Sequence, residues 1–227
     1  MDRQGAGKIS RIQAEIKNKD TFLFDLDGTL IDSSKDIAVA VNYALTELGF
    51  STLPEEDIIK HVGYGGKKLI EGVLKTNDKE LIEKGVKLFR EHYFSNPVVH
   101  TTLYPYVYET LQSLKEEGKK LAIVTNKYQD ISKLIIQKTG IAHLIDAIVG
   151  GDTTGSKKPD KEPVLFALKQ LDSSPQKAVM IGDSEVDIQA AKDAGVKAVL
   201  VTYGFGKVEK ALSFNPDFVI NSLKEIL

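Results

Sequence analysis

From residue 105 onward, short apolar runs alternate with helix-like stretches, and this alternation restricts the fold more than any other feature of the sequence. Strands that alternate with helices predict a parallel sheet with helices on both of its faces. The apolar runs contain no regular apolar–polar alternation, so we expect strands that are buried on both sides. In chain order, the predicted strands are 120–124, 145–149, 177–181, 197–204 and 216–220.

An earlier apolar run, at residues 21–24, precedes a long stretch without a convincing strand. Residues 34 to about 95 instead repeat apolar side chains at helical spacing, as in "SKDIAVAVNYALTELG", and predict a small helical bundle. We therefore expect an α/β protein with a doubly wound parallel sheet formed by residues 21–33 and 101–227. The helical bundle is inserted at 34–100, and residues 1–20 form an N-terminal extension.

Composition and charge exclude several classes of protein. Of 227 residues, 42% are apolar and 27% charged, which is ordinary for a globular chain that buries a core. The net charge of −2 gives no reason to expect a nucleic-acid partner. There is no cysteine, which excludes disulfides and thiolate metal sites. No stretch approaches the ~18 apolar residues that span a membrane, and the first twenty residues lack a signal-peptide core. We expect a cytoplasmic protein without a membrane partner.

Several predicted strands end in polar residues that can do chemistry. In open parallel sheets, ligands bind beyond the carboxyl ends of the strands, so the topology would gather these residues although they are far apart in the sequence. The strand-end residues, together with two lysines from a loop, are Asp25, Asp27, Thr125, Asn126, Lys157, Lys158 and Asp183.

This set of groups favours phosphoryl transfer with a metal ion. Clustered aspartates repel one another unless a cation joins them, and an all-oxygen site with one or two carboxylates is typical of Mg²⁺. An aspartate can attack phosphorus and form an aspartyl-phosphate. A second aspartate can protonate the leaving oxygen and later deprotonate the attacking water. Without cysteine or a placed histidine, a serine- or thiol-type triad does not fit.

Four short motifs resemble the signatures of the haloacid dehalogenase (HAD) superfamily, in its order and at its spacing. They are "FDLDGTLIDS", "IVTN", "KKPDKEP" and "MIGDSEVDIQAAKDAG", between residue 22 and about residue 195. The resemblance implies a Rossmann-like core, and the helical insert matches the small helical cap of this superfamily. Four motifs in order are far more specific than any one of them.

The resemblance also implies roles for the acidic residues. Asp25 would be the nucleophile and Asp27 the general acid and base. The metal ion, Mg²⁺, would be held by Asp25, by the backbone carbonyl of Asp27, and by Asp183. Asp187 would support the waters of the metal, or Lys158, without touching the ion.

The remaining motif residues would contact the phosphate. Thr125 and Asn126 match the second signature and would hold phosphoryl oxygens. Lys158 stands directly before Pro159 and matches the lysine of the family, so we prefer it to Lys157 for the catalytic and phosphate-binding role.

Within the superfamily, the chain most resembles phosphoglycolate phosphatases, and "HVGYGGKKLIEGVL" carries part of that likeness. Glycines before a helix expose N–H groups that favour anions. Gly65, Gly66 and Lys67 are therefore candidate contacts for the carboxylate of 2-phosphoglycolate. The expected function is a hydrolase, a Mg²⁺-dependent phosphatase acting on a small phosphorylated metabolite.

Two alternatives remain open at this point. The first is another phosphotransferase of the superfamily, such as a pyrophosphatase or a sugar-phosphate phosphatase or mutase. The mutases usually carry a histidine just after the first signature, and "DSSKDIAVAV" has none. The second is a catalytically silent binding domain. Such a domain typically loses the nucleophile or the metal-binding aspartates, and all of them are present here.

Overall fold

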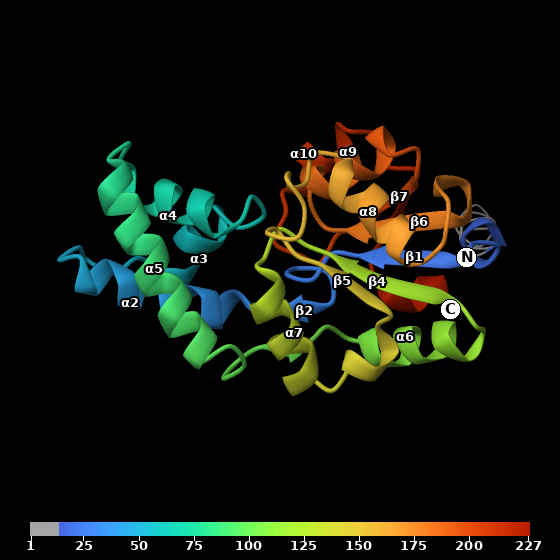
Figure 1. The fold of residues 1–227 in the computed structure, drawn as a ribbon, viewed down its shortest axis with the longest axis horizontal. Coiled ribbons are helices and arrows are strands. Elements are labelled where there is room, and N and C mark those ends of the chain that lie inside the picture. The colour runs from blue at the N-terminus through green and yellow to red at the C-terminus, as the bar shows by residue number, and fades with distance from the viewer. Residues whose placement is uncertain (1–13) are drawn as a thin grey trace, which may run out of the picture.

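The computed structural model describes residues 14–227, and its centre is a parallel six-stranded sheet (Figure 1). The strand order is β5-β4-β1-β6-β7-β8, so the earliest strand lies in the middle. The strands are β1 (Thr21–Phe24), β4 (Lys120–Val124), β5 (Ala147–Val149), β6 (Ala178–Gly182), β7 (Lys197–Val201) and β8 (Phe218–Ile220). The predicted α/β class is confirmed, and β5, β7 and β8 are shorter than the apolar runs that predicted them.

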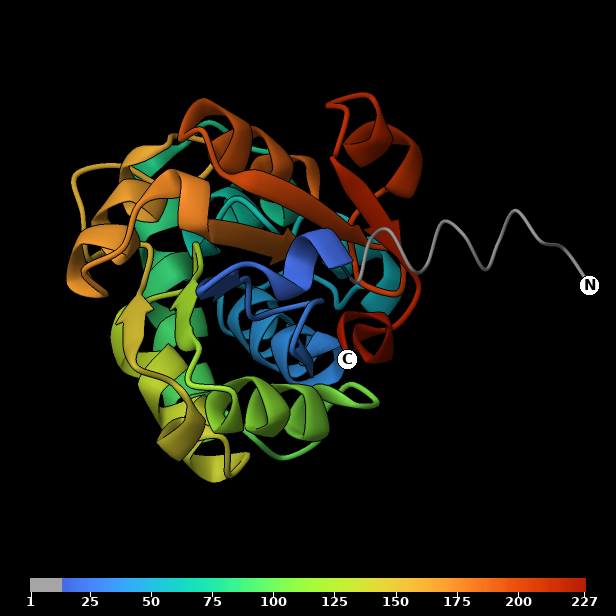
Figure 2. The same cartoon turned by 90° about the vertical axis from the view of Figure 1, so that its right-hand side faces the viewer.

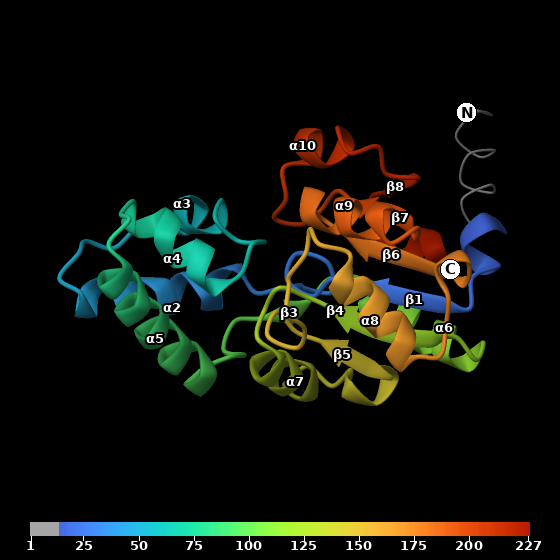
Figure 3. The ribbon, with the colours of Figure 1, turned by 45° about the horizontal axis from the view of Figure 1, so that its top comes forward.

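Both faces of the sheet are covered by helices, as Figures 2 and 3 show. Phe22 and Phe24 of β1 point to one face and Leu23 to the other, and all three are fully buried. The α-helices that follow residue 103 are α6 (Val107–Glu116), α7 (Gln129–Lys138), α8 (Glu162–Gln170), α9 (Glu185–Asp193) and α10 (Val208–Leu212). Helices α6 and α7 pack with the phenylalanine face and α8 and α9 with the leucine face. Burial on two sides explains why the strands carry continuous apolar runs.

Four helices lie apart from the sheet, at the carboxyl ends of its strands, and are called the cap below (Figure 1). They are α2 (Ser34–Glu47), α3 (Glu55–Ile59), α4 (Gly66–Leu74) and α5 (Lys79–Ser95). The chain leaves and re-enters the core beside a short antiparallel pair, β2 (Ile31–Asp32) and β3 (Thr102–Leu103). Residues 34–95 contain no strand, as predicted. The residue limits of the two domains, 34–100 for the cap, stay a prediction.

The expected N-terminal extension lies partly outside the described residues, which begin at residue 14. Residues 14–17 are helical, and Ile16 is 1% exposed within the main apolar core. Between residues 14 and 227, every helix is too short or too polar to cross a bilayer. The cytoplasmic location stays a prediction.

Asp36 in the first turn of α2 ties the two connections between cap and core together. Its carboxylate accepts hydrogen bonds from the backbone N–H groups of Val99, His100 and Thr101, and from the Thr101 hydroxyl. Burial acts to raise the pKa of Asp36, but these hydrogen bonds outweigh it and hold the pKa below its ordinary value of 3.8. The segment that returns from the cap is thereby fixed to the segment that enters it.

We expect Asp36→Asn to lower the free energy of unfolding by about 2–3 kcal/mol at pH 7, because an amide cannot accept the same set of charge-assisted hydrogen bonds. The native pKa is depressed, so the stabilisation is present above the unfolded-state pKa and is lost as the pH falls through the native pKa. Urea unfolding of both proteins should show a constant difference above about pH 5 that shrinks below about pH 4. Asp57→Asn, on an exposed site, is the matched control. A pH-independent difference would contradict this role for Asp36.

Candidate active site

Three aspartates, two from the ends of neighbouring strands and one from a helix, meet at the carboxyl edge of the sheet. Asp25 directly follows β1, Asp183 directly follows β6, and Asp187 lies in the first turn of α9. Because β1 and β6 are paired in parallel, their carboxyl ends lie side by side. One carboxylate oxygen from each aspartate lies within 4.8 Å of the other two. The structure thus brings together three residues that the sequence motifs had singled out.

Lys158 is the cation that lies among these carboxylates. Its Nζ donates to Oδ1 of Asp25 at 2.8 Å and to Oδ1 of Asp187 at 2.6 Å. The lysine is 2% exposed. Burial acts to lower its pKa, but the two aspartates outweigh burial and raise the pKa to about 12. Lys158 is therefore a constant positive charge. Its neighbour Lys157 lies elsewhere, with Nζ 5.6 Å from the ring centre of Tyr128.

Asp183 lies in a cradle of backbone groups. Its Oδ2 accepts hydrogen bonds from the N–H groups of Phe205 at 2.7 Å and Gly206 at 2.9 Å. A Cβ at Gly28 would lie 2.3 Å from the same oxygen. Gly28 also adopts a φ of +83°, which side chains other than glycine rarely tolerate. Both the close approach and the dihedral require glycine after Asp27.

The acidic groups fit a divalent cation. Burial raises the pKa of Asp25 to about 6, while Lys158 acts in the opposite direction. Burial also raises the pKa of Asp183 well above its ordinary value, and the charges of Asp187 and Asp25 add to this effect. Lys158 alone therefore leaves negative charge uncompensated in a place with little water. A set of carboxylate oxygens is the donor chemistry that hard divalent ions prefer, so these residues can hold a metal ion.

Asp27 is paired with a lysine that the sequence analysis did not single out. Nζ of Lys127 lies 3.0 Å from Oδ1 and 2.9 Å from Oδ2 of Asp27, and the Ser33 hydroxyl donates to Oδ1 at 2.5 Å. Lys127 follows Asn126 just beyond the end of β4. The rule that selected polar residues at strand ends would have found Lys127 if it had been extended by one residue.

Thr125 and Asn126 both line the cavity described below, but their side chains make different hydrogen bonds. The Thr125 hydroxyl accepts from the backbone N–H of Lys127 at 3.2 Å, and its own proton can serve another acceptor. The Asn126 amide donates to the carbonyls of Gly63 and Lys158, each at 2.8 Å. The Asn126 side chain therefore joins a cap loop to the lysine loop, and its expected phosphate contact stays a prediction.

A cavity lies between the aspartates and the cap. From the core it is lined by residues that include Asp25, Asp27, Thr125, Lys127 and Asp183, and from the cap by Gly65, Gly66, Leu69, Phe89 and Tyr93. Of the three predicted cap contacts, Gly65 and Gly66 reach the cavity. Lys67 is exposed and does not line it, because the inward positions of α4 belong to Leu69 and Ile70.

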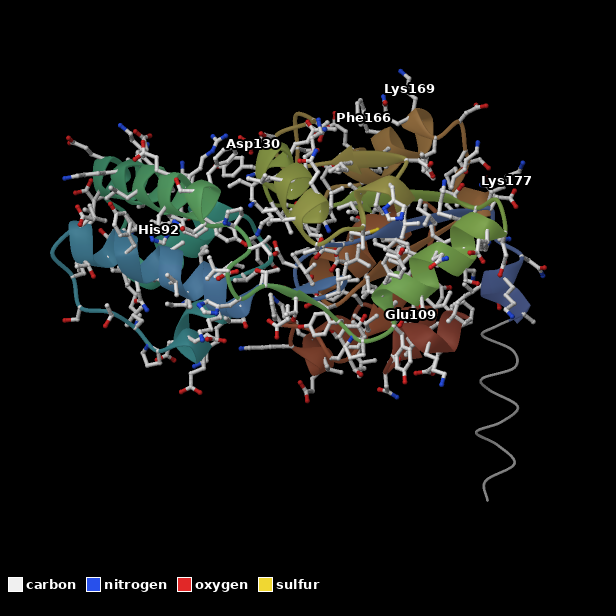
Figure 4. The ribbon with its side chains drawn as sticks, turned by 90° about the horizontal axis from the view of Figure 1, so that it is seen from below. His92, Glu109, Asp130, Phe166, Lys169 and Lys177 are labelled. Carbon is white, nitrogen blue, oxygen red and sulfur yellow. The ribbon has the colours of Figure 1, made fainter. Side chains whose placement is uncertain are left out.

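Polar contacts at the rim join the cap to the core. The Tyr64 hydroxyl donates to Oε1 of Glu185 at 2.6 Å, and Nζ of Lys210 lies 2.6 Å from the same oxygen. Elsewhere, Arg90 of α5 donates to Asp130 of α7 at 2.8 Å. Figure 4 shows Asp130 where these two helices approach each other. The cap is thus held over the aspartates from more than one element of the core.

Comparisons with known proteins agree with this geometry. The phosphoglycolate phosphatase of Aquifex aeolicus is 43% identical to this chain over 205 residues, which cover 90% of this chain and 93% of that protein. The phosphoglycolate phosphatase of Colwellia psychrerythraea is 40% identical over 220 residues, which cover 94% of this chain and 97% of that protein. A crystal structure described as a predicted phosphoglycolate phosphatase from Haemophilus somnus superposes with a TM-score of 0.87 at 29% identity, covering 92% of this chain and 96% of that one.

The family comparison covers most of the residues discussed above. The sequence model described as "Haloacid dehalogenase-like hydrolase" matches residues 22–201, a range that runs from β1 to the end of β7 and includes the cap. The chain therefore belongs to the haloacid dehalogenase-like hydrolase family, in which it is a phosphoric monoester hydrolase.

Proposed function

We propose that this protein is a Mg²⁺-dependent phosphatase that hydrolyses 2-phosphoglycolate through an aspartyl-phosphate on Asp25. The observation that carries the proposal is the grouping of Asp25, Asp183 and Asp187 around Lys158 beneath the cap. A phosphate monoester adds its own negative charge to that of the three aspartates, and the single positive charge of Lys158 cannot neutralise the sum. Mg²⁺ held by Asp25, Asp183 and the backbone carbonyl of Asp27 would neutralise that charge and polarise the phosphoryl group.

In the first half of the reaction, a carboxylate oxygen of Asp25 attacks phosphorus, and the bond from phosphorus to the ester oxygen breaks. Lys158 fixes the rotation of the Asp25 carboxylate through its 2.8 Å contact with Oδ1. The Thr125 hydroxyl can donate to a phosphoryl oxygen. The departing alkoxide takes the proton that Asp27 carries at this stage, as general acid catalysis requires.

In the second half, Asp27 is a carboxylate and accepts a proton from a water molecule. The oxygen of that water attacks phosphorus, the bond from phosphorus to Asp25 breaks, and inorganic phosphate is released. The contacts of Asp27 with Lys127 and Ser33 hold its carboxylate in one orientation during this step. The closed cap keeps bulk water from the acyl phosphate until the alcohol has left.

The choice of 2-phosphoglycolate rests on the similarity to phosphatases named for that substrate, over almost the whole of both chains. The position of the cavity between the aspartates and the cap suits a small molecule. Phosphate release from 2-phosphoglycolate, pyrophosphate and a series of sugar phosphates should rank 2-phosphoglycolate first by kcat/KM. A higher kcat/KM for pyrophosphate would indicate a pyrophosphatase, and a higher value for a sugar phosphate would indicate a sugar-phosphate phosphatase.

Asp25→Asn should lower kcat by at least about 10⁴-fold, because it removes the nucleophile at almost unchanged volume. Its thermal unfolding should remain cooperative, which separates loss of chemistry from loss of fold. Mass spectrometry of acid-quenched wild-type protein should find the phosphoryl group on the peptide that contains Asp25. A phosphoryl group on a serine or histidine would refute the aspartyl-phosphate.

Gly28→Ala should weaken Mg²⁺ binding by at least about tenfold, because the added Cβ displaces the carboxylate of Asp183. Calorimetric titration with Mg²⁺ measures the affinity directly. In wild-type protein, EDTA should abolish phosphatase activity and Mg²⁺ should restore it, with Ca²⁺ a poor substitute in an octahedral site.

Gly49→Ala provides the matched control for this test. Gly49 has a φ of +81°, close to that of Gly28, but nothing lies within 4 Å of its added Cβ. Both variants should lose about 1 kcal/mol of stability through backbone strain. Only Gly28→Ala should lose Mg²⁺ affinity. Equal Mg²⁺ affinity in the two variants would show that the cradle around Asp183 does not support a metal site.

A further inference from the structure

Lys127 is a cation that faces the cavity, and its side chain is 8% exposed. Of the cavity-lining residues in the described part of the chain, it alone carries a positively charged side chain. Lys158 lies deeper, among the aspartates, and is not part of the lining. Nζ of Lys127 lies 2.9 Å from Oδ2 of Asp27, and both residues line the cavity. An anionic group that enters the cavity would therefore meet this ammonium group.

Tyr93 of the cap lies against the same ammonium group. Nζ of Lys127 is 4.4 Å from the centre of the Tyr93 ring. Tyr93 is 1% exposed, lines the cavity, and its hydroxyl has no hydrogen-bond partner among the described residues. Burial raises the pKa of this hydroxyl to about 12, so it keeps its proton and remains a donor. A buried donor without a partner is costly unless a ligand provides an acceptor.

The other cap residues that line the cavity carry no charged side chain, although Gly65 and Gly66 at the start of α4 can offer backbone N–H groups. Ile37, Val62, Leu69 and Phe89 contribute apolar side chains to the lining. Transfer of an ionised carboxylate to apolar surroundings is strongly unfavourable unless it is paired. The carboxylate of a small substrate is therefore disfavoured against these apolar side chains. The described lining offers it an ammonium group and a hydroxyl side by side at Lys127 and Tyr93.

We propose that Lys127 and Tyr93 form the subsite for the carboxylate of the substrate, with the ammonium group pairing with it and the hydroxyl donating to it. The proposal rests on the proposed function, in which Asp27 transfers a proton at the ester oxygen. In 2-phosphoglycolate the carboxylate carbon is two bonds from that oxygen. Lys127 touches both oxygens of Asp27, and an ammonium group has three donors, so one cation can serve Asp27 and the substrate together.

The test compares two substrates that differ only at the end that carries the carboxylate in 2-phosphoglycolate. Ethyl phosphate carries a methyl group where 2-phosphoglycolate carries its carboxylate, so the ratio of their kcat/KM values measures recognition of the carboxylate. Lys127→Met keeps the aliphatic stem and removes the charge. It should lower the ratio by about 100-fold, the usual scale for removing one partner of a buried charge pair. Lys133→Met, on the exposed side of α7, is the control and should leave the ratio unchanged.

Tyr93→Phe removes the unpaired hydroxyl and keeps the ring, so it tests the subsite without disturbing the Lys127–Asp27 ion pair. It should lower the ratio by about tenfold. Inhibition by glycolate gives a second reading that does not depend on turnover. Its inhibition constant should rise in both variants, whereas the constant for inorganic phosphate should change little.

The results that would refute the carboxylate subsite differ from those that would refute the proposed phosphatase function. If Lys127→Met lowers kcat/KM equally for both substrates, the lysine serves Asp27 alone and the subsite is refuted. If Tyr93→Phe also leaves glycolate inhibition unchanged, the cap takes no part in carboxylate binding. Wild-type protein that hydrolyses ethyl phosphate but not 2-phosphoglycolate would refute the substrate and the subsite while leaving the phosphatase. Wild-type protein that releases phosphate from neither would refute the proposed function itself.

Discussion

The repulsion among Asp25, Asp183 and Asp187 at one edge of the sheet is the interaction that the surrounding structure has to offset. Neighbouring parallel strands bring their carboxyl ends together, so the pairing of β1 with β6 creates this concentration of charge directly. Lys158 arrives from the loop between β5 and α8 and neutralises part of it. Backbone N–H groups and the missing side chain of Gly28 hold Asp183 in place. These buried like charges lower the stability of the fold, and they form a site that can hold a cation.

The cap is joined to the core by two kinds of contact. Where the chain passes between core and cap, the buried Asp36 carboxylate accepts several hydrogen bonds. Separating the two segments would therefore cost a large free energy. At the rim, the Arg90–Asp130 ion pair is over 40% exposed on both sides and contributes little free energy. A cap that opens would therefore separate at the rim and turn about the segments that Asp36 joins. Such a movement would also break the hydrogen bond from Asn126 to the Gly63 carbonyl, and it would leave the aspartates in place because they belong to the core.

The sequence predicted the parts of the site that depend on local chain order. Strand ends and motif spacing led to Asp25, Asp183 and Lys158, because the carboxyl ends of parallel strands must share an edge. The exposure of Lys67 depends on the rotation of α4 against its neighbours, which periodicity does not define to within one residue. The approach of Lys127 to Tyr93 joins a core loop to a cap helix, and no local pattern encodes the distance between them. Contacts within the sheet were thus predictable, and contacts across the cavity required the structure.

Asp25 and Asp27 are two residues apart, yet they have different cationic partners. Asp25 pairs with Lys158, which lies behind the aspartates and away from the cavity, whereas Asp27 pairs with Lys127, which faces the cavity and the cap. Two carboxylates in unlike surroundings can take unlike roles, one as nucleophile and one as proton carrier. In the proposed mechanism, Lys158 supports the nucleophile, and Lys127 supports both the proton carrier and recognition of the substrate. Loss of Lys158 would affect every phosphate ester alike, whereas a change at Lys127 could alter which leaving group is accepted and still retain the nucleophile and its metal site.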